Sequence, residues 1–185
     1  MRLRNAIYRQ GRRAVIGAAS FTMGAVLSGA RSDPEFMRYD ADARRVELTI
    51  IAAFDQTNSG FNFNGGFHGS HRITVPIGWQ VRVTFVNRDL MPHSVAVVRE
   101  GKLLPIRIAR PVFAGAASRA PERGLPAGAQ QDGIAFVAGQ SGAYLVACGV
   151  PGHTALGTYL RLTISTDATV PTYEISAANR SGEQE

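Results

Sequence analysis

The only cysteine of the chain shares a short loop with a histidine. Residues 148–153 read Cys-Gly-Val-Pro-Gly-His, so four residues separate the thiol from the imidazole. Glycine permits tight backbone turns and proline restricts φ, so this loop can be both sharp and stiff. We therefore expect the sulfur of Cys148 and the ring of His153 to face one point.

A second imidazole is available at His93, which follows Met91 and Pro92 at the start of an expected strand. In a Greek-key sandwich, strands that are distant in sequence become neighbours, so this strand end can meet the loop at residues 148–153. One thiolate and two imidazoles in a near-trigonal arrangement are the donor set of electron-transfer copper sites. The soft sulfur favours Cu(I), while the imidazoles tolerate Cu(II).

Each of these residues alone has an ordinary structural explanation. A lone buried cysteine usually packs as a small hydrophobic side chain. Either His93 or His153 could equally be a strand-end or loop histidine, so the metal interpretation depends on the three residues together. The spacing of His68 and His71 could support a second metal, but two solvated loop histidines bind metal poorly without further ligands.

Short segments of alternating polarity, separated by turn residues, predict an all-β fold. In the segment at residues 79–87, Trp79, Val81, Val83 and Phe85 share one parity, as in a strand with one buried face. The expected strands are Arg45–Ala53, His71–Val75, Trp79–Asn87, His93–Arg99, Gly133–Ala138, Gly142–Cys148 and Thr158–Ser165. Their density indicates a Greek-key β-sandwich over residues 45–165.

Three segments fall outside this strand pattern. Residues 109–131 are rich in Ala, Gly and Pro, and we expect a long excursion with room for one short helix. The charged segment 31–44, which contains Pro34, is expected to be a linker. The polar segment 166–185 is expected to be a tail.

Basic residues are concentrated at the amino end. The chain has 185 residues and a formal net charge of +6, but five arginines fall within the first thirteen residues and leave 15 basic against 14 acidic residues. That balance excludes a basic nucleic-acid-binding surface on the body of the protein. Paired arginines, a mildly apolar stretch over residues 14–30 and small residues at its end predict a signal peptide over residues 1–30, of the twin-arginine type.

The alternative for this segment is an uncleaved membrane anchor. Either way, the body of the chain is expected to be periplasmic or otherwise extracytoplasmic. Disulfides normally form in such a compartment, yet a single cysteine permits no intramolecular disulfide. An unpaired thiol there is prone to oxidation unless it is buried or bound to something.

Several motifs in the body of the chain resemble the cupredoxins, and among them the sulfocyanin and rusticyanin group. These motifs are Phe61-Asn62-Phe63-Asn64-Gly65, Ile73–Trp79, Pro92-His93-Ser94 and Cys148–His153, and residues 113–116 are also similar. The resemblance covers roughly residues 47–164, with the order of the motifs kept. It implies a copper-binding β-sandwich with one copper ion per chain, His93, Cys148 and His153 as equatorial ligands, and support of the copper loops by the asparagine-bearing segment.

The chain departs from this group at the axial ligand. The family places a methionine beyond the second loop histidine, and Thr158 stands at that position here. Neither Met37 nor Met91, the two methionines outside the leader, occupies it. The axial ligand is therefore absent, or is supplied by the Thr158 hydroxyl, a backbone carbonyl or water, and we expect a copper centre with a perturbed spectrum.

The resemblance implies a one-electron carrier and not an enzyme. Such a protein would exchange electrons with larger redox proteins, would use no nucleic acid or small-molecule substrate, and could associate with a membrane through its N-terminal segment. The leading alternative is a copper-handling protein that captures or delivers the ion without redox cycling. A thiol enzyme using Cys148 and His153 has less support because no orienting carboxylate is apparent nearby, and a sandwich without metal could serve as an interaction module.

Overall fold

The burial of the strands follows the alternation seen in the sequence. In β5 (Gln80–Asn87), Val81, Val83 and Phe85 are buried, while Gln80 and Arg82 are exposed. The first half of β3 (Arg45–Ala52) and most of β9 (Tyr159–Ser165) alternate in the same way. Apolar faces of this kind are stable when two sheets cover one another.

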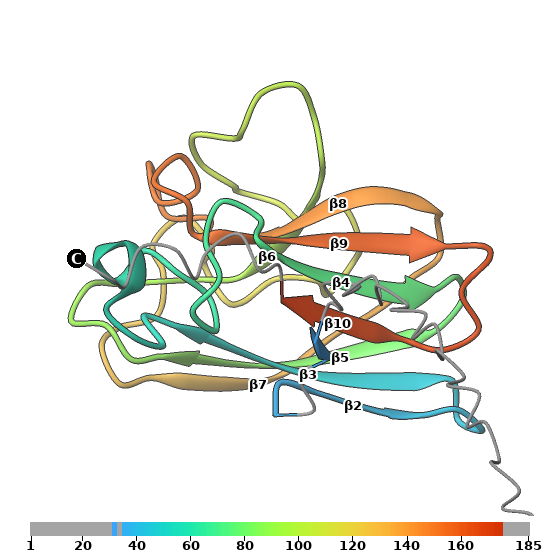
Figure 1. The fold of residues 1–185 in the computed structure, drawn as a ribbon. Helices are drawn as coiled ribbons and strands as arrows, with labels where there is room; N and C mark the ends of the chain where they lie inside the picture. Colours follow the sequence, from blue (N-terminus) through green and yellow to red (C-terminus); the bar gives the residue numbers. More distant parts are fainter. Residues whose placement is uncertain (1–30, 33–34, 176–185) are drawn as a thin grey trace, which may run out of the picture.

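Two sheets do so here and form a β-sandwich (Figure 1). The structure is a computed structural model that describes residues 31–32 and 35–175. The strand order is β1-β10-β4-β9-β8-β6 in one sheet and β2-β3-β5-β7 in the other. The other elements are β1 (Arg31–Ser32), β2 (Met37–Asp40), the 3-10 helix η1 (Thr57–Gly60), β4 (His71–Pro76), β6 (Ala96–Arg99), β7 (Gln130–Val137), β8 (Gly142–Ala147) and β10 (Thr172–Ile175).

Consecutive strands from β3 to β8 alternate between the two sheets. As a result, β3 pairs with β5 in parallel and β4 pairs with β9 in parallel, while the other pairings are antiparallel. This arrangement confirms the predicted all-β Greek-key sandwich. It also gathers η1, the loop after β8 and the start of β9 at one end, on the left of Figure 1.

Aromatic rings connect the two layers of the core. The ring centroids of Phe63 and Phe85 lie 6.2 Å apart in an edge-on contact. Phe113 stacks on Phe136 of β7 at 5.4 Å and lies 5.1 Å from Tyr144 of β8. Because β7 and β8 belong to different sheets, Phe113 fastens the segment between β6 and β7 to both layers.

That segment contains no helix in residues 109–131, all of which the structure describes. Its main chain pairs instead with residues 93–97. Ser118 donates to the carbonyl of Val95 at 2.8 Å, and Leu125 and His93 exchange hydrogen bonds of 2.6 and 3.3 Å. Backbone groups satisfied by this extended pairing are not available for helical hydrogen bonds.

The seven strands expected from the sequence are all present, with ends shifted by a few residues. β6 begins at Ala96, after the expected start at His93, because His93 and Val95 pair with the excursion and not with β8, and β7 begins at Gln130, before the expected start at Gly133. The sheets also extend beyond residues 45–165. The expected linker contributes β1 and β2, with Phe36 buried beside Tyr173, and the expected tail contributes β10.

Phe85 provides a test of this core. Replacing Phe85 with alanine removes a fully buried ring that packs on Phe63, so we expect the free energy of unfolding to fall by about 3–5 kcal/mol. Arg82→Ala on the exposed face of the same strand should change it by less than about 0.5 kcal/mol. Urea denaturation of the metal-free protein measures both, and equal losses would contradict the assigned strand faces.

Candidate metal centre

Three elements bring Cys148, His153 and His93 together. Cys148 follows the last residue of β8, and its N–H donates to the carbonyl of Thr158 at 3.0 Å, which closes the loop between β8 and β9. His153 lies within this loop. His93 precedes β6 and is held by its pairing with Leu125. The predicted meeting of a loop with a distant strand end is therefore present.

The three donor atoms form a nearly equilateral triangle. Cys148 Sγ lies 3.7 Å from His93 Nδ1 and 3.6 Å from His153 Nδ1, and the two Nδ1 atoms are 3.4 Å apart. A point equidistant from three such corners is about 2.1 Å from each, close to the lengths of about 2.0–2.3 Å of zinc–nitrogen and zinc–sulfur bonds. The donors thus fit around a single metal ion without rearrangement.

The sulfur lies in a small cage of hydrogen-bond donors. Cys148 is fully buried. The backbone N–H of Ser94 donates to Sγ at 3.4 Å, and the N–H of Val150 is a second donor. Ser94 is itself fixed, because its hydroxyl donates to the carbonyl of Pro121 at 2.6 Å and accepts from the N–H of Gly149 at 2.8 Å.

Burial governs the protonation of these groups. It raises the pKa of Cys148, although hydrogen bonds from Ser94 and Val150 act in the opposite direction. Burial lowers the pKa of His153 to about 4, assisted by the neighbouring ring of His93. Burial also lowers the pKa of His93, although Asp89 opposes it. At neutral pH the metal-free site therefore holds a thiol and two neutral imidazoles, and binding a metal requires loss of the thiol proton.

The two imidazoles have different surroundings. Nε2 of His93 lies 2.9 Å from Oδ2 of Asp89, whereas His153 meets the ring of Phe61 edge-on with centroids 5.3 Å apart. His93 is fully buried and His153 is half-buried. Burial raises the pKa of Asp89, but hydrogen bonds from His93, Met91 and Leu90 outweigh it, so the net pKa is lowered and the carboxylate is ionised.

Hydrogen bonds from within the loop and from η1 hold the loop that carries His153 in place. Thr154 donates its hydroxyl to the carbonyl of Cys148 at 2.7 Å, and Asn58 donates to the carbonyl of Leu156 at 2.7 Å. Gly157 has φ +107°, and a Cβ there would lie 2.9 Å from Nδ2 of Asn58. A side chain at position 157 would therefore disturb both the turn and its anchor.

Thr158 is completely buried directly after this turn. Its N–H donates to the carbonyl of His153 at 3.0 Å, and its carbonyl accepts from Cys148. Within the described part of the chain, Oγ1 of Thr158 is buried without a hydrogen-bond partner. An unsatisfied buried hydroxyl costs about 1–3 kcal/mol, so its retention requires an explanation.

The other candidate residues do not join the cluster. His71 is buried, and its Nδ1 lies 3.1 Å from the hydroxyl of Tyr173. His68 is exposed and packs edge-on to Phe67 and Tyr159. Among residues 31–32 and 35–175, His93, Cys148 and His153 form the one grouping of such side chains that could hold a metal. The sequence analysis considered a second site at His68 and His71 and disfavoured it, and these two residues belong to no such grouping in the described part of the chain.

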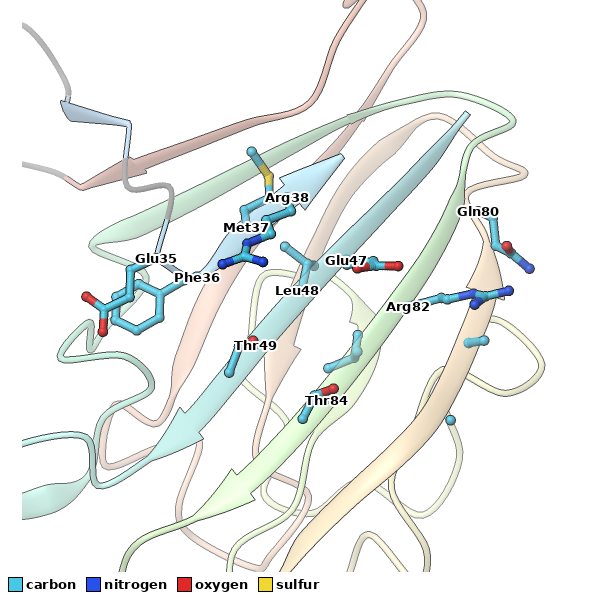
Figure 2. Close-up of a pocket in the computed structure, with 13 residues that line it drawn as sticks. Glu35, Phe36, Met37, Arg38, Glu47, Leu48, Thr49, Gln80, Arg82 and Thr84 are labelled. Carbon is cyan, nitrogen blue, oxygen red and sulfur yellow. The ribbon is translucent and has the colours of Figure 1, made fainter. Parts of the chain in front are cut away.

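An open hollow lies elsewhere, on the outer face of the four-stranded sheet (Figure 2). Glu35, Arg38, Glu47 and Arg82 contribute two charges of each sign to its lining. None of the three donor residues lines it. The metal centre is thus built in the packed loops at the end of the sandwich and not in this hollow.

Sequence reasoning missed three residues that shape the site. Asp89 is not singled out in the sequence analysis, although it precedes His93 by four residues. Ser94 was noted beside His93, but its approach to the sulfur was not foreseen. Asn58 was not considered, whereas Asn62, which was, bonds mainly within its own turn, to Asp55 and Thr57. The sequence analysis found no carboxylate near the site, and Asp89 corrects that expectation.

Comparison with known proteins decides the family. The model of the Sulfocyanin (SoxE) domain matches residues 32–176. The chain belongs to the sulfocyanin family. A sulfocyanin of Sulfolobus acidocaldarius is 28% identical over 146 residues, which cover 72% of this chain and 70% of that protein.

A solved structure agrees with the fold. A rusticyanin variant superposes with a TM-score of 0.51 at 17% identity, over 74% of this chain and 86% of that one. Auracyanin A of Chloroflexus aurantiacus, a blue copper protein, gives a TM-score of 0.46 at 19% identity, over 65% and 99% of the two chains. As a sulfocyanin-type cupredoxin, the chain is a mononuclear copper protein that carries single electrons.

No helix in the described residues is both long and apolar enough to cross a bilayer. The predicted signal peptide, residues 1–30, lies outside the described residues.

The lowered pKa of His153 predicts acid sensitivity of the metal-free protein. In the unfolded chain this imidazole takes up a proton near pH 6.5, but in the folded chain only near pH 4. Between these values the unfolded state binds more protons, so the free energy of unfolding should fall as the pH drops from about 6.5 to about 4. Urea denaturation in the presence of a chelator measures this slope. His153→Gln should flatten it, and an unchanged slope would contradict the assignment.

Proposed function

We propose that Nδ1 of His93, Sγ of Cys148 and Nδ1 of His153 hold the copper ion of this protein. The proposal is carried by the triangle of donor atoms, with sides of 3.4–3.7 Å. When bound, copper supplies a one-electron couple between Cu(I) and Cu(II). The chain's own residues keep the three donors at fixed separations, which limits the rearrangement that accompanies each electron transfer.

We propose further that the hydroxyl of Thr158 takes the axial position. A buried oxygen with no other partner supports this role, as do the hydrogen bonds that tie the Thr158 backbone to both Cys148 and His153. An oxygen donor is harder than a thioether and favours Cu(II). The alternatives of a backbone carbonyl, water or no axial ligand at all remain outcomes of the experiment below.

The electron path to partner proteins is proposed to run through the half-buried ring of His153. Pro151, Ala155 and Leu156 are exposed around it, with Leu156 50% exposed. Ile106 is 73% exposed, and its carbonyl accepts the N–H of Gly152 at 2.8 Å, so it extends the same apolar rim. A small apolar rim suits weak complexes that dissociate rapidly after each electron transfer.

Export and the absence of enzymatic activity complete the proposal. The twin-arginine pattern before residue 30 supports a periplasmic location, with cleavage after Ala30 or retention as a membrane anchor. A purely redox role needs no substrate cleft at the site. The partners are therefore proposed to be other redox proteins and not small molecules or nucleic acid.

Copper titration tests the donor set. One equivalent of Cu(II) added to residues 31–185 should give an intense visible absorption from sulfur-to-copper charge transfer. Cys148→Ala should abolish it, whereas His68→Ala, at an exposed histidine outside the cluster, should retain it. Absence of the band from the unaltered protein would contradict the copper assignment. Irreversible voltammetry despite a strong band would favour the copper-handling alternative.

Thr158→Val tests the axial oxygen, because valine keeps the shape and removes the hydroxyl. In the metal-free protein the change should stabilise the fold by about 1–3 kcal/mol, since an unpartnered buried hydroxyl is lost. In the copper protein it should raise the midpoint potential and alter the visible spectrum. Thr158→Ser, which retains the hydroxyl, is the matched control. A spectrum and potential unchanged by valine would remove Thr158 from the ligand set.

A further inference from the structure

The hydrogen bond between Asp89 and His93 has features that a surface ion pair lacks. Nε2 of His93 and Oδ2 of Asp89 are 2.9 Å apart, and the side chains are 0% and 17% exposed. The contact lies on the far side of the ring from Nδ1, which faces Cys148. Any charge on Asp89 therefore acts directly on the donor that would bind copper.

The carboxylate is held in place by the turn that precedes His93. Oδ1 of Asp89 accepts the N–H of Leu90 at 2.6 Å and that of Met91 at 3.3 Å, while Oδ2 remains for the ring. The N–H of Asp89 donates to Oδ1 of Asn87 at 3.0 Å. Asn87 is itself buried, and its side-chain amide donates to the carbonyls of Met91 and Leu125. This network fixes the direction of the carboxylate before any metal arrives.

Asp89 has no cationic partner other than His93 among residues 31–32 and 35–175. The guanidinium of the adjacent Arg88 lies over the ring of Phe54, 5.5 Å from its centroid. In the same part of the chain, no carboxylate hydrogen-bonds to His153. The carboxylate thus hydrogen-bonds to one of the two imidazoles, acts on the other only through space, and is not neutralised by a neighbouring arginine or lysine.

A carboxylate on the outer nitrogen of a metal-binding histidine has two physical effects. It retains the proton on Nε2, which leaves the lone pair of Nδ1 free for the metal, and it makes the ring a stronger donor. It also stabilises the higher charge of Cu(II) relative to Cu(I) through the Coulomb interaction. Hydrogen bonding to a ligand is an established lever on reduction potential.

We infer that Asp89 is a positioning and potential-setting residue of this centre, which orients His93 for binding through Nδ1 and lowers the reduction potential. This inference rests on the proposed copper ligand set. It assigns the tuning of the couple to a carboxylate in the turn after β5, in addition to the axial position.

Asp89→Asn tests the effect of the charge, because asparagine has nearly the same shape as aspartate. Asparagine can still accept a hydrogen bond from Nε2 but carries no charge. We expect at least about a tenfold fall in the affinity for Cu(II) relative to Cu(I), which raises the midpoint potential by about 59 mV or more. Asp42→Asn is the matched control, because it removes the same formal charge from the exposed turn between β2 and β3. Equal potentials in the unaltered protein, Asp89→Asn and Asp42→Asn would overturn the inference.

A second measurement does not depend on copper. Nitrogen NMR of the metal-free protein should show His93 with its proton on Nε2, and Asp89→Ala should move part of the population to the Nδ1–H form. An Nδ1–H ring in the unaltered protein would overturn the positioning role, even if Asp89→Asn failed to fold. If the unaltered protein shows a strong copper absorption but Asp89→Asn leaves the midpoint potential unchanged, only the role of Asp89 is contradicted. If the unaltered protein shows no copper absorption, the proposed ligand set is contradicted as well.

Discussion

Cys148 Sγ lies 3.6 and 3.7 Å from the Nδ1 atoms of two imidazoles, in a region from which most water is excluded. Burial disfavours the charged forms of all three groups, so the metal-free site is neutral. Three converging lone-pair donors in a poorly solvated space are stabilised by a cation. This contact between one sulfur and two rings is the constraint that the surrounding loops must satisfy.

The surrounding hydrogen bonds keep that triangle nearly independent of the metal. Ser94 and Thr154 fix the two sides of Cys148, and Asn58 holds the loop that carries His153. The contacts of Ser94 and Asn58 join segments that belong to different parts of the sandwich, whereas that of Thr154 closes the loop on itself. A copper ion held this way can change its charge while its ligands move little, which is the physical requirement for rapid transfer of single electrons.

Thr158 and Asp89 make this centre chemically distinct from a site with a thioether axial ligand. Thr158 places a hydroxyl oxygen without a hydrogen-bond partner beside the loop that carries His153, and Asp89 directs its carboxylate at His93. Both proposed interactions stabilise Cu(II) more than Cu(I). Together they would give a lower potential than the same sandwich with methionine at position 158 and no acid at position 89.

The sequence by itself determined the all-β class, the seven central strands and the three residues that the fold groups as candidate donors. The alternation of polar and apolar residues is a local property, because each strand turns one face toward the core. The spacing from Cys148 to His153 is also local, because both residues belong to one loop. The resemblance of several motifs added the family. The three strands in the expected linker and tail were not recognised, since β2 exposes most of its residues and β10 is short.

Only the tertiary structure decided which groups surround the donors. Ser94 meets a sulfur 54 residues away, and Asn58 meets a carbonyl 98 residues away. The direction of the Asp89 carboxylate depends on Asn87, which is fixed by the excursion between β6 and β7. Contacts of this kind follow from how the sheets pack and cross, and no local pattern of residues records that packing.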